Sequence, residues 1–276
     1  IEDDLTATDV PLEVGGATAV ADALDEGMAN DISRAEKAAL PLVGLLLLFV
    51  FGSVVAAFMP LVVGGLSILG SLGILSVLAG FQQVNVFAQA VVTLLGLGLA
   101  IDYGLFMVSR FREELDKGRD VREAVATTTA TAGQTVVFSA GMVAVALSGL
   151  FLFPQAFLKS VAYGSISAVG LAALLSVTVL PSLFGLLGKN IDKFSVRKTS
   201  RRARRIEDTF WYKLPRWAMR HAKLMTVGIC ALLIALTLPV LGVKFGGINE
   251  TYLPPTHETR MAQDKFNEEF PSFRTE

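Results

Sequence analysis

Residues 96–109 read GLGLAIDYGLFMVS, and Asp102 is the only charged side chain in this stretch. No other Asp, Glu, Lys or Arg occurs between Ala38 and Ser109. A stretch this long and this apolar predicts membrane-spanning helices, because about 20 apolar residues cross the hydrocarbon core. A charge inside such a helix costs about 3 kcal/mol on insertion scales, so it usually faces a bundle interior or a watery path. We interpret Asp102 as a functional carboxylate; the alternative is a protonated acid that only holds helices together.

The composition of the whole chain predicts a polytopic membrane protein. Apolar residues make up 53% of the 276 residues and charged residues only 18%. Met59-Pro60 and residues 82–85 divide the longest uncharged segment into three spans, and residues 153–155 form a short turn between two later ones. We expect six spans, at residues 38–58, 60–81, 86–109, 134–153, 160–187 and 224–242.

The distribution of charge predicts the orientation of these spans. Residues 1–37 carry ten acids and two bases, whereas residues 188–222 carry eleven bases and three acids. Residues 110–133 carry five further Lys and Arg side chains. Because short loops rich in Lys and Arg stay on the cytoplasmic side, we expect 110–133 and 188–222 inside the plasma membrane, and 1–37 and 244–276 outside it.

The same boundaries give the expected domain organisation. Residues 1–37 are the end of one external domain, 38–187 and 223–243 hold the spans, 188–222 is a basic cytoplasmic segment, and 244–276 begin a second external domain. Both ends are too short for an independent core, so we interpret the chain as the middle of a larger polypeptide.

Two other classes of binding site are disfavoured by the sequence. Gly96 and Gly98 suggest a dinucleotide loop, but Ile101 replaces its third glycine. Residues 201–205 read RRARR, which occurs in nucleic-acid-binding patches. Beside a membrane span, this run instead predicts contact with anionic lipid headgroups. We therefore expect anionic lipids as partners of segment 188–222, no nucleic acid and no cofactor.

The helix around Asp102 presents two different faces. Gly98, Asp102 and Phe106 recur every four residues and share one side, whereas Tyr103 points about 100° away. Small residues form a second row, at Gly96, Ala100 and Gly104. Such a row lets another helix approach closely. We expect Asp102 to face the interior of the bundle, buried from lipid but short of partners in this chain.

The depth of Asp102 suggests a neighbour on the following span. Arg110 marks the expected cytoplasmic interface, which places Asp102 about 12 Å deep, near the midplane. Ser139 lies a similar distance into the next span, so we expect it at the same depth on an adjacent, facing helix. A serine in a membrane helix more often bonds its own backbone, and the residues alone favour that role.

The motif around Asp102 resembles a known family. The string GLAIDYGLFMVSRFREE at 98–114 resembles the fourth transmembrane helix of the MMPL branch of the resistance-nodulation-division (RND) transporters. The resemblance continues in TVVFSA at 135–140 and LFPQAFLKS at 152–160. It reaches FGGINETYLPP at 245–255 and FPSFRTE at 270–276, strings similar to members of the branch that export a mycolic-acid glycolipid.

The resemblance implies an all-α polytopic membrane protein: a six-helix half-bundle of an RND transporter, with fragments of α/β porter domains at both ends. It implies a secondary active transporter, not an enzyme, in which the proton-motive force drives export or flipping of trehalose monomycolate across the plasma membrane for cell-envelope assembly. The alternative is an RND-fold lipid sensor or scaffold without active transport.

The resemblance also implies roles for single residues. Asp102 and Tyr103 match an Asp-Tyr pair of a proton relay, and Ser139 matches a serine that joins it. The partner of this pair is a second Asp-Tyr pair on helix ten, in the other half of the same polypeptide. The residues expected to line the relay pocket are Gly98, Leu99 and Phe106. Protons are then the coupling ion.

Cysteine labelling tests the expected topology. After Cys230 is replaced, Ser200→Cys is expected to react with a membrane-impermeant thiol reagent only from the cytoplasm, and Ser272→Cys only from outside. Labelling of both thiols from one side would contradict the six-span topology, because that topology places an odd number of spans between Ser200 and Ser272.

Overall fold

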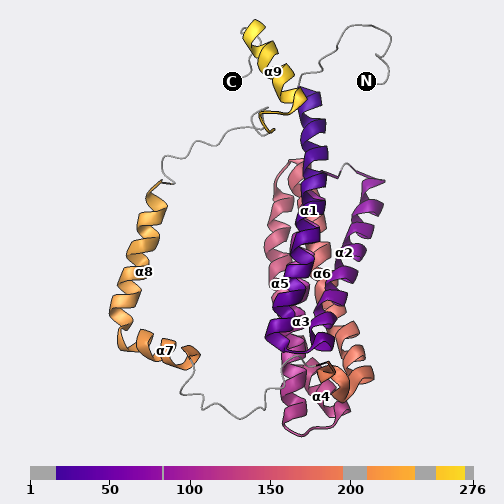
Figure 1. The fold of residues 1–276 in the computed structure, drawn as a ribbon, viewed down its shortest axis with the longest axis vertical. Coiled ribbons are helices and arrows are strands. Elements are labelled where there is room, and N and C mark those ends of the chain that lie inside the picture. Colours follow the sequence, from indigo (N-terminus) through magenta and orange to yellow (C-terminus); the bar gives the residue numbers. More distant parts are fainter. Residues whose placement is uncertain (1–16, 83, 195–209, 240–252, 271–276) are drawn as a thin grey trace. The chain divides into compact units, whose positions relative to one another are not determined.

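The computed structural model describes residues 17–82, 84–194, 210–239 and 253–270 (Figure 1). The regular elements in these ranges are all helices, which confirms the expected all-α membrane protein. The chain forms two compact units. Residues 25–197 form the bundle that holds the predicted site, and the other unit contains residues 1–24 and 198–276.

The first two helices of the chain differ from the expected spans. α1 (Ala17–Phe51) runs without a break past residue 37, where a domain boundary was expected, and α2 covers Val54–Ala79. The expected division at Met59-Pro60 is therefore wrong, because Pro60 lies inside α2. The first span does not extend to residue 58.

A glycine, not the proline, makes the turn between α1 and α2. Gly52 has φ 65°, a conformation that glycine adopts without steric cost. Ser53 follows as the N-cap of α2, and its side chain accepts a hydrogen bond from the backbone N–H of Ala56. Pro60 packs against α3 instead, as described below.

The rest of the bundle follows in order as α3 Val86–Asp116, α4 Val121–Thr128, the π-helical η2 Thr129–Gly133, α5 Gln134–Ser148, the 3₁₀ turn η3 Gly149–Leu152, α6 Ala156–Leu187 and η4 Gly188–Asp192. The turn expected at residues 153–155 is confirmed. α3 continues past its expected end at residue 109. The span expected from residue 134 begins at residue 121, because α4, η2, α5 and η3 form one helical stretch.

Small residues bring α2, α3 and α6 into close contact. A Cβ added to Gly104 would lie 2.7 Å from the Cβ of Pro60, and one added to Gly164 would lie 2.8 Å from a methyl group of Val92. Real side chains do not tolerate such distances, so these helices approach each other through glycine. The small-residue row expected on α3 is confirmed, and it fixes the side of α3 that faces the bundle.

The second unit contains three described helices. These are α7 Phe210–Arg220, α8 Ala222–Thr237 and α9 Glu258–Glu269. α7 and α8 meet at a bend of 90°. The strands expected in α/β fragments at the ends do not occur in residues 17–37 or 253–270, and residues 1–16, 240–252 and 271–276 lie outside the described part.

Within the described residues, four helical stretches are long and apolar enough to cross a membrane, and α7 with α8 makes a fifth if the bent pair is one span. The four are Val54–Ala79, Phe87–Asp116, Val121–Leu152 and Ala156–Asp192. α1 is not among them, because Arg34, Glu36 and Lys37 directly precede its apolar part. The last expected span begins in α8 and extends beyond residue 239, outside the described residues.

The close approach of α2 and α3 predicts a specific sensitivity at Gly104. Gly104→Ala places a methyl group against Pro60, and overpacking of this kind costs about 1–3 kcal/mol. We expect a lower thermal unfolding midpoint for the detergent-purified protein. Gly65→Ala is the matched control, because a Cβ on Gly65 meets no atom within 4 Å. Equal midpoints for the two variants would contradict the packing.

Candidate functional site

Asp102 lies on the one row of α3 that the bundle leaves uncovered. Leu94, Gly98, Asp102 and Phe106 are all exposed, and we call these four residues the open row. The carboxylate of Asp102 has no hydrogen bond or ion pair with any described residue. We expected Asp102 to be buried, but within this unit it is exposed. The reason is that α2 and α6 pack against the other side of α3.

Tyr103 takes the opposite environment. Only 6% of it is exposed, and it packs within the hydrophobic core of the bundle. Its hydroxyl is buried and has no hydrogen-bond partner among the described residues. Consecutive residues of one helix thus place a carboxylate outside the bundle and a phenol inside it.

Ser139 is half-buried on α5, and its hydroxyl bonds to no described residue. Thr135 and Ser148 on the same helix each donate a hydrogen bond to the backbone carbonyl four residues earlier. Of these three hydroxyl residues, only Ser139 lacks this bond. The residues alone favoured a bond from Ser139 to its own backbone, and the structure does not contain that bond.

The expected depth of Ser139 agrees with the packing, but its facing arrangement does not. A Cβ on Gly133 would lie 4.0 Å from the end of Met107. The two helical stretches run antiparallel. Asp102 lies five residues before Met107, and Ser139 lies six residues after Gly133. The depths of Asp102 and Ser139 in the membrane therefore agree within about one helical turn. However, α5 packs mainly on α6, and α3 makes no extensive contact with α5.

The residues expected to line the relay pocket divide between two environments. Gly98 and Phe106 flank Asp102 on the open row, and no atom lies within 4 Å of a Cβ added to Gly98. Leu99 is half-buried and packs against the core. These three residues do not enclose a cavity with Asp102 in the described unit.

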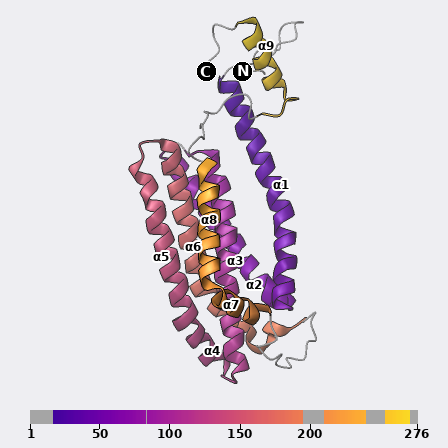
Figure 2. The same cartoon turned by 90° about the vertical axis from the view of Figure 1, so that its left-hand side faces the viewer.

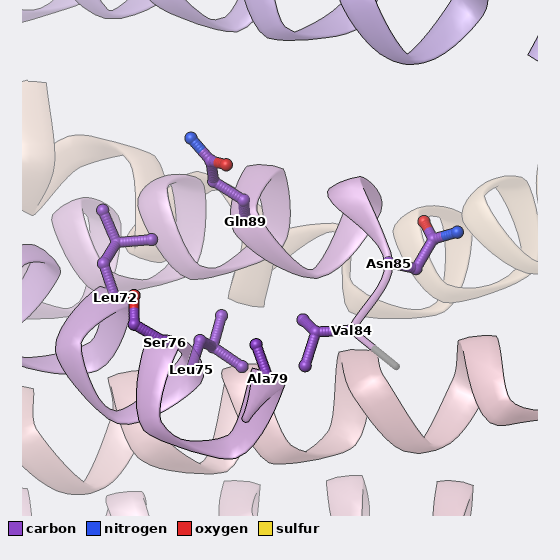
Figure 3. Close-up of a pocket in the computed structure, with 7 residues that line it drawn as sticks. All are labelled: Leu72, Leu75, Ser76, Ala79, Val84, Asn85 and Gln89. Atoms are coloured by element: carbon purple, nitrogen blue, oxygen red, sulfur yellow. The ribbon is translucent and has the colours of Figure 1, made fainter. Parts of the chain in front are cut away.

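A cavity of about 410 Å³ lies elsewhere, between the end of α2 and the start of α3. Its lining residues are Leu72, Leu75, Ser76, Ala79, Val84, Asn85 and Gln89. Figure 3 shows the apolar side chains of Leu75, Ala79 and Val84 grouped together, with the amides of Asn85 and Gln89 directed away from them. Polar groups therefore do not converge on this cavity.

A buried ion cluster at the end of α3 was not predicted from the sequence. Glu114 is 1% exposed, and its carboxylate lies 2.9 Å from a side-chain nitrogen of each of Arg110, Lys117 and Arg119. The Lys117 ammonium donates hydrogen bonds to Glu113 and Glu114, and these bonds raise the pKa of Lys117. The bond to Glu113 has the larger effect. The spacing of Arg110 and Glu114 by four residues was the available signal.

Arg112 joins α3 to two further segments at the same end of the bundle. Its guanidinium donates one hydrogen bond to the carbonyl of Phe51, over 2.9 Å, and another to the carboxylate of Asp192. Ser53 donates to the carbonyl of Ile191 over 2.8 Å. The α1–α2 turn, α3 and η4 are thus tied together, whereas the carboxylate at mid-helix is free.

No metal site is evident in the described ranges, because no group of three or more His, Cys, Asp or Glu side chains comes together there. The groups around Asp102 that the structure describes are one carboxylate and hydroxyl groups. These can bind a proton and donate or accept hydrogen bonds.

Several long apolar helices define a multi-pass membrane protein. The sequence model of the MMPL family matches residues 1–224, and the chain belongs to this family. This membership confirms the resemblance inferred from residues 98–114.

Similar proteins carry names that refer to lipid export. The chain is 45% identical to the trehalose monomycolate exporter MmpL3 of Mycobacterium tuberculosis (strain ATCC 25618 / H37Rv), over 96% of the chain and 31% of that protein. It is 42% identical to the protein of the same name in Mycolicibacterium smegmatis, over 96% of the chain and 29% of that protein. It is 35% identical to the mycolic acid-containing lipids exporter MmpL11 of that species, over 91% and 26%. The chain thus spans under a third of the length of these relatives.

The Glu114 cluster predicts a difference between two adjacent carboxylates. Glu114→Gln leaves three cations around a buried neutral amide, so we expect it to lower the thermal unfolding midpoint by several degrees. Glu113→Gln is the matched control, since the side chain of Glu113 is 52% exposed and surface ion pairs contribute little. A midpoint for Glu114→Gln that equals the control would show that the cluster does not hold the bundle.

Proposed function

We propose that this chain carries the proton-handling part of a transporter that exports or flips a mycolic-acid glycolipid across the plasma membrane, driven by the proton gradient. The observation that carries the proposal is the unpaired carboxylate of Asp102 on the open row of α3. The names of the relatives support trehalose monomycolate as the substrate. Protons are the coupling ion in this proposal.

The open row requires a partner surface. An unpaired carboxylate near the middle of a membrane helix is unfavourable against acyl chains, and Leu94 and Phe106 on the same row are 72% and 47% exposed. A second half of the same polypeptide, with the Asp-Tyr pair of helix ten, supplies what the row lacks: a polar partner at the level of Asp102 and apolar cover on either side.

A proton drives transport only if its binding energy differs between two conformations. A proton from outside binds Asp102 or its partner and removes one negative charge from the interface. The neutral site attracts the facing helix differently, and the two halves move relative to each other around the lipid. The hydroxyls of Tyr103 and Ser139 pass or orient the proton, which then leaves to the cytoplasm near Arg110.

The proposed orientation places the basic segment 188–222 at the cytoplasmic surface, in contact with anionic lipid headgroups. α7 supports this placement, because its spacing puts Lys213, Arg216 and Arg220 on one side and Leu214 and Ala218 on another. The 90° bend between α7 and α8 suits a helix that lies along the membrane surface when α8 crosses it.

A lipid sensor or scaffold with the same fold is the second candidate, since the uncovered face of α3 also suits stable partner binding. The two functions differ in energy use. Lipid movement that follows an imposed pH gradient supports transport, and lipid-dependent binding without gradient-dependent movement supports the sensor.

Replacement of the carboxylate tests the proposed function. Asp102→Asn keeps the size of the side chain and its hydrogen bonding but cannot cycle a proton, so we expect transport to be abolished while the protein still inserts. The assay is growth complementation in a strain that depends on this gene, with the protein expressed at its natural length. Ser109→Ala, an exposed position further along α3, is the control for expression. Full complementation by Asp102→Asn would refute the proton relay.

A further inference from the structure

Among the described residues, a few fully enclosed hydroxyls lack any hydrogen bond. They are Ser71, Tyr103, Thr128, Ser165 and Ser176. Buried hydroxyls are normally bonded, so each exception requires an explanation. On α6 the contrast is clear, because Ser167 and Ser182 donate to the carbonyl four residues earlier whereas Ser176 does not.

Ser176 lies on the row of α6 that faces α3. A Cβ on Gly96 of α3 would lie 3.7 Å from the Cβ of Ala168, and the rings of Phe111 and Phe184 stack with centroids 4.4 Å apart. Ala168 and Phe184 belong to one i, i+4 row, and Ser176 is its middle member. Both ends of this row therefore contact α3, the helix that lies beside α6 in Figures 1 and 2.

The same two contacts place Ser176 at the level of Tyr103. The helices α3 and α6 run parallel. Tyr103 is seven residues after Gly96, and Ser176 is eight residues after Ala168. At 1.5 Å per residue their levels agree within about 2 Å. Two buried hydroxyls without partners thus share one level of adjacent, parallel helices: the phenol of the expected relay and a serine with no assigned role.

We propose that Ser176 is a positioning residue for Tyr103, with its hydroxyl linked to the phenol oxygen through one bridging water. The Tyr103 O–H is then free to be donated towards the relay carboxylates. A bridging water is plausible because buried waters occupy sites with unsatisfied polar groups. This inference rests on the proposed function, since it gives Tyr103 a role in proton transfer.

A purely structural role for Ser176 predicts the opposite result from a positioning role. Removing an unbonded buried hydroxyl is neutral or stabilising when nothing depends on it. Ser176→Ala would then leave transport unchanged at every pH. If Ser176 holds Tyr103, the same change lowers transport and alters its pH dependence.

The experiment is a double-mutant cycle on the natural-length protein in phosphatidylethanolamine–cardiolipin vesicles, with trehalose monomycolate as probe and imposed pH gradients. We expect Ser176→Ala to lower transport about three- to tenfold, the worth of one hydrogen bond, and to shift the pH profile. The double variant Ser176→Ala/Tyr103→Phe should transport no less than the single variant Tyr103→Phe. Once the phenol hydroxyl is gone, Ser176 has nothing to position, so its loss has no further effect.

Ser165→Ala is the matched control, since Ser165 is also a buried, unbonded serine of α6 but lies 11 residues away from Ser176. Ser165→Ala should leave transport unchanged, both in the wild-type background and in the Tyr103→Phe background. Wild-type transport and pH profile for Ser176→Ala, or independent losses in its double variant, would overturn the positioning role. If Asp102→Asn is inactive in that case, the proposed function stands and only the role of Ser176 falls.

Discussion

The close approach of α3 to α2 and α6 through small residues determines how the rest of the bundle is arranged. Gly104 leaves room for Pro60, and Gly164 leaves room for Val92. A helix held this closely cannot rotate about its axis without a clash. The contact therefore fixes the rotation of α3, and with it the side on which each functional group lies. Asp102 faces outward and Tyr103 inward because the glycine row faces the neighbours.

The C-terminal end and the middle of α3 are held by different forces. At its C-terminal end, Glu114 pairs with Arg110, Lys117 and Arg119, and Arg112 joins α3 to Phe51 and Asp192, over distances typical of strong ion pairs and hydrogen bonds. Around Tyr103 the packing is apolar and the buried hydroxyls are unbonded. Directional bonds thus concentrate away from the relay residues. An arrangement of this kind leaves the groups near Asp102 available for new partners without loosening the bundle.

Several features followed from local sequence signals, and others did not. The turn at 153–155 and the glycine row of α3 were predicted, because proline and small residues act at the position where they occur. The break at Gly52 was missed because Pro60 is the stronger helix-breaking signal, whereas in the structure Pro60 lies inside α2 and packs against Gly104. The π-helical η2 and the buried Glu114 cluster were also missed, although the spacing of Arg110 and Glu114 by four residues was a local signal.

The sequence by itself determined that this is a multi-pass membrane protein of the MMPL family, and it singled out Asp102. Hydrophobicity and charge act locally, so a lone carboxylate within a long apolar stretch is visible without any structure. Only the tertiary structure decided which groups share a face or a level. It exposed Asp102 on the open row, buried Tyr103 and set Ser176 at the same level on the adjacent helix. The physical reason is that helix rotation and register arise from contacts between helices, and a single helix does not encode them.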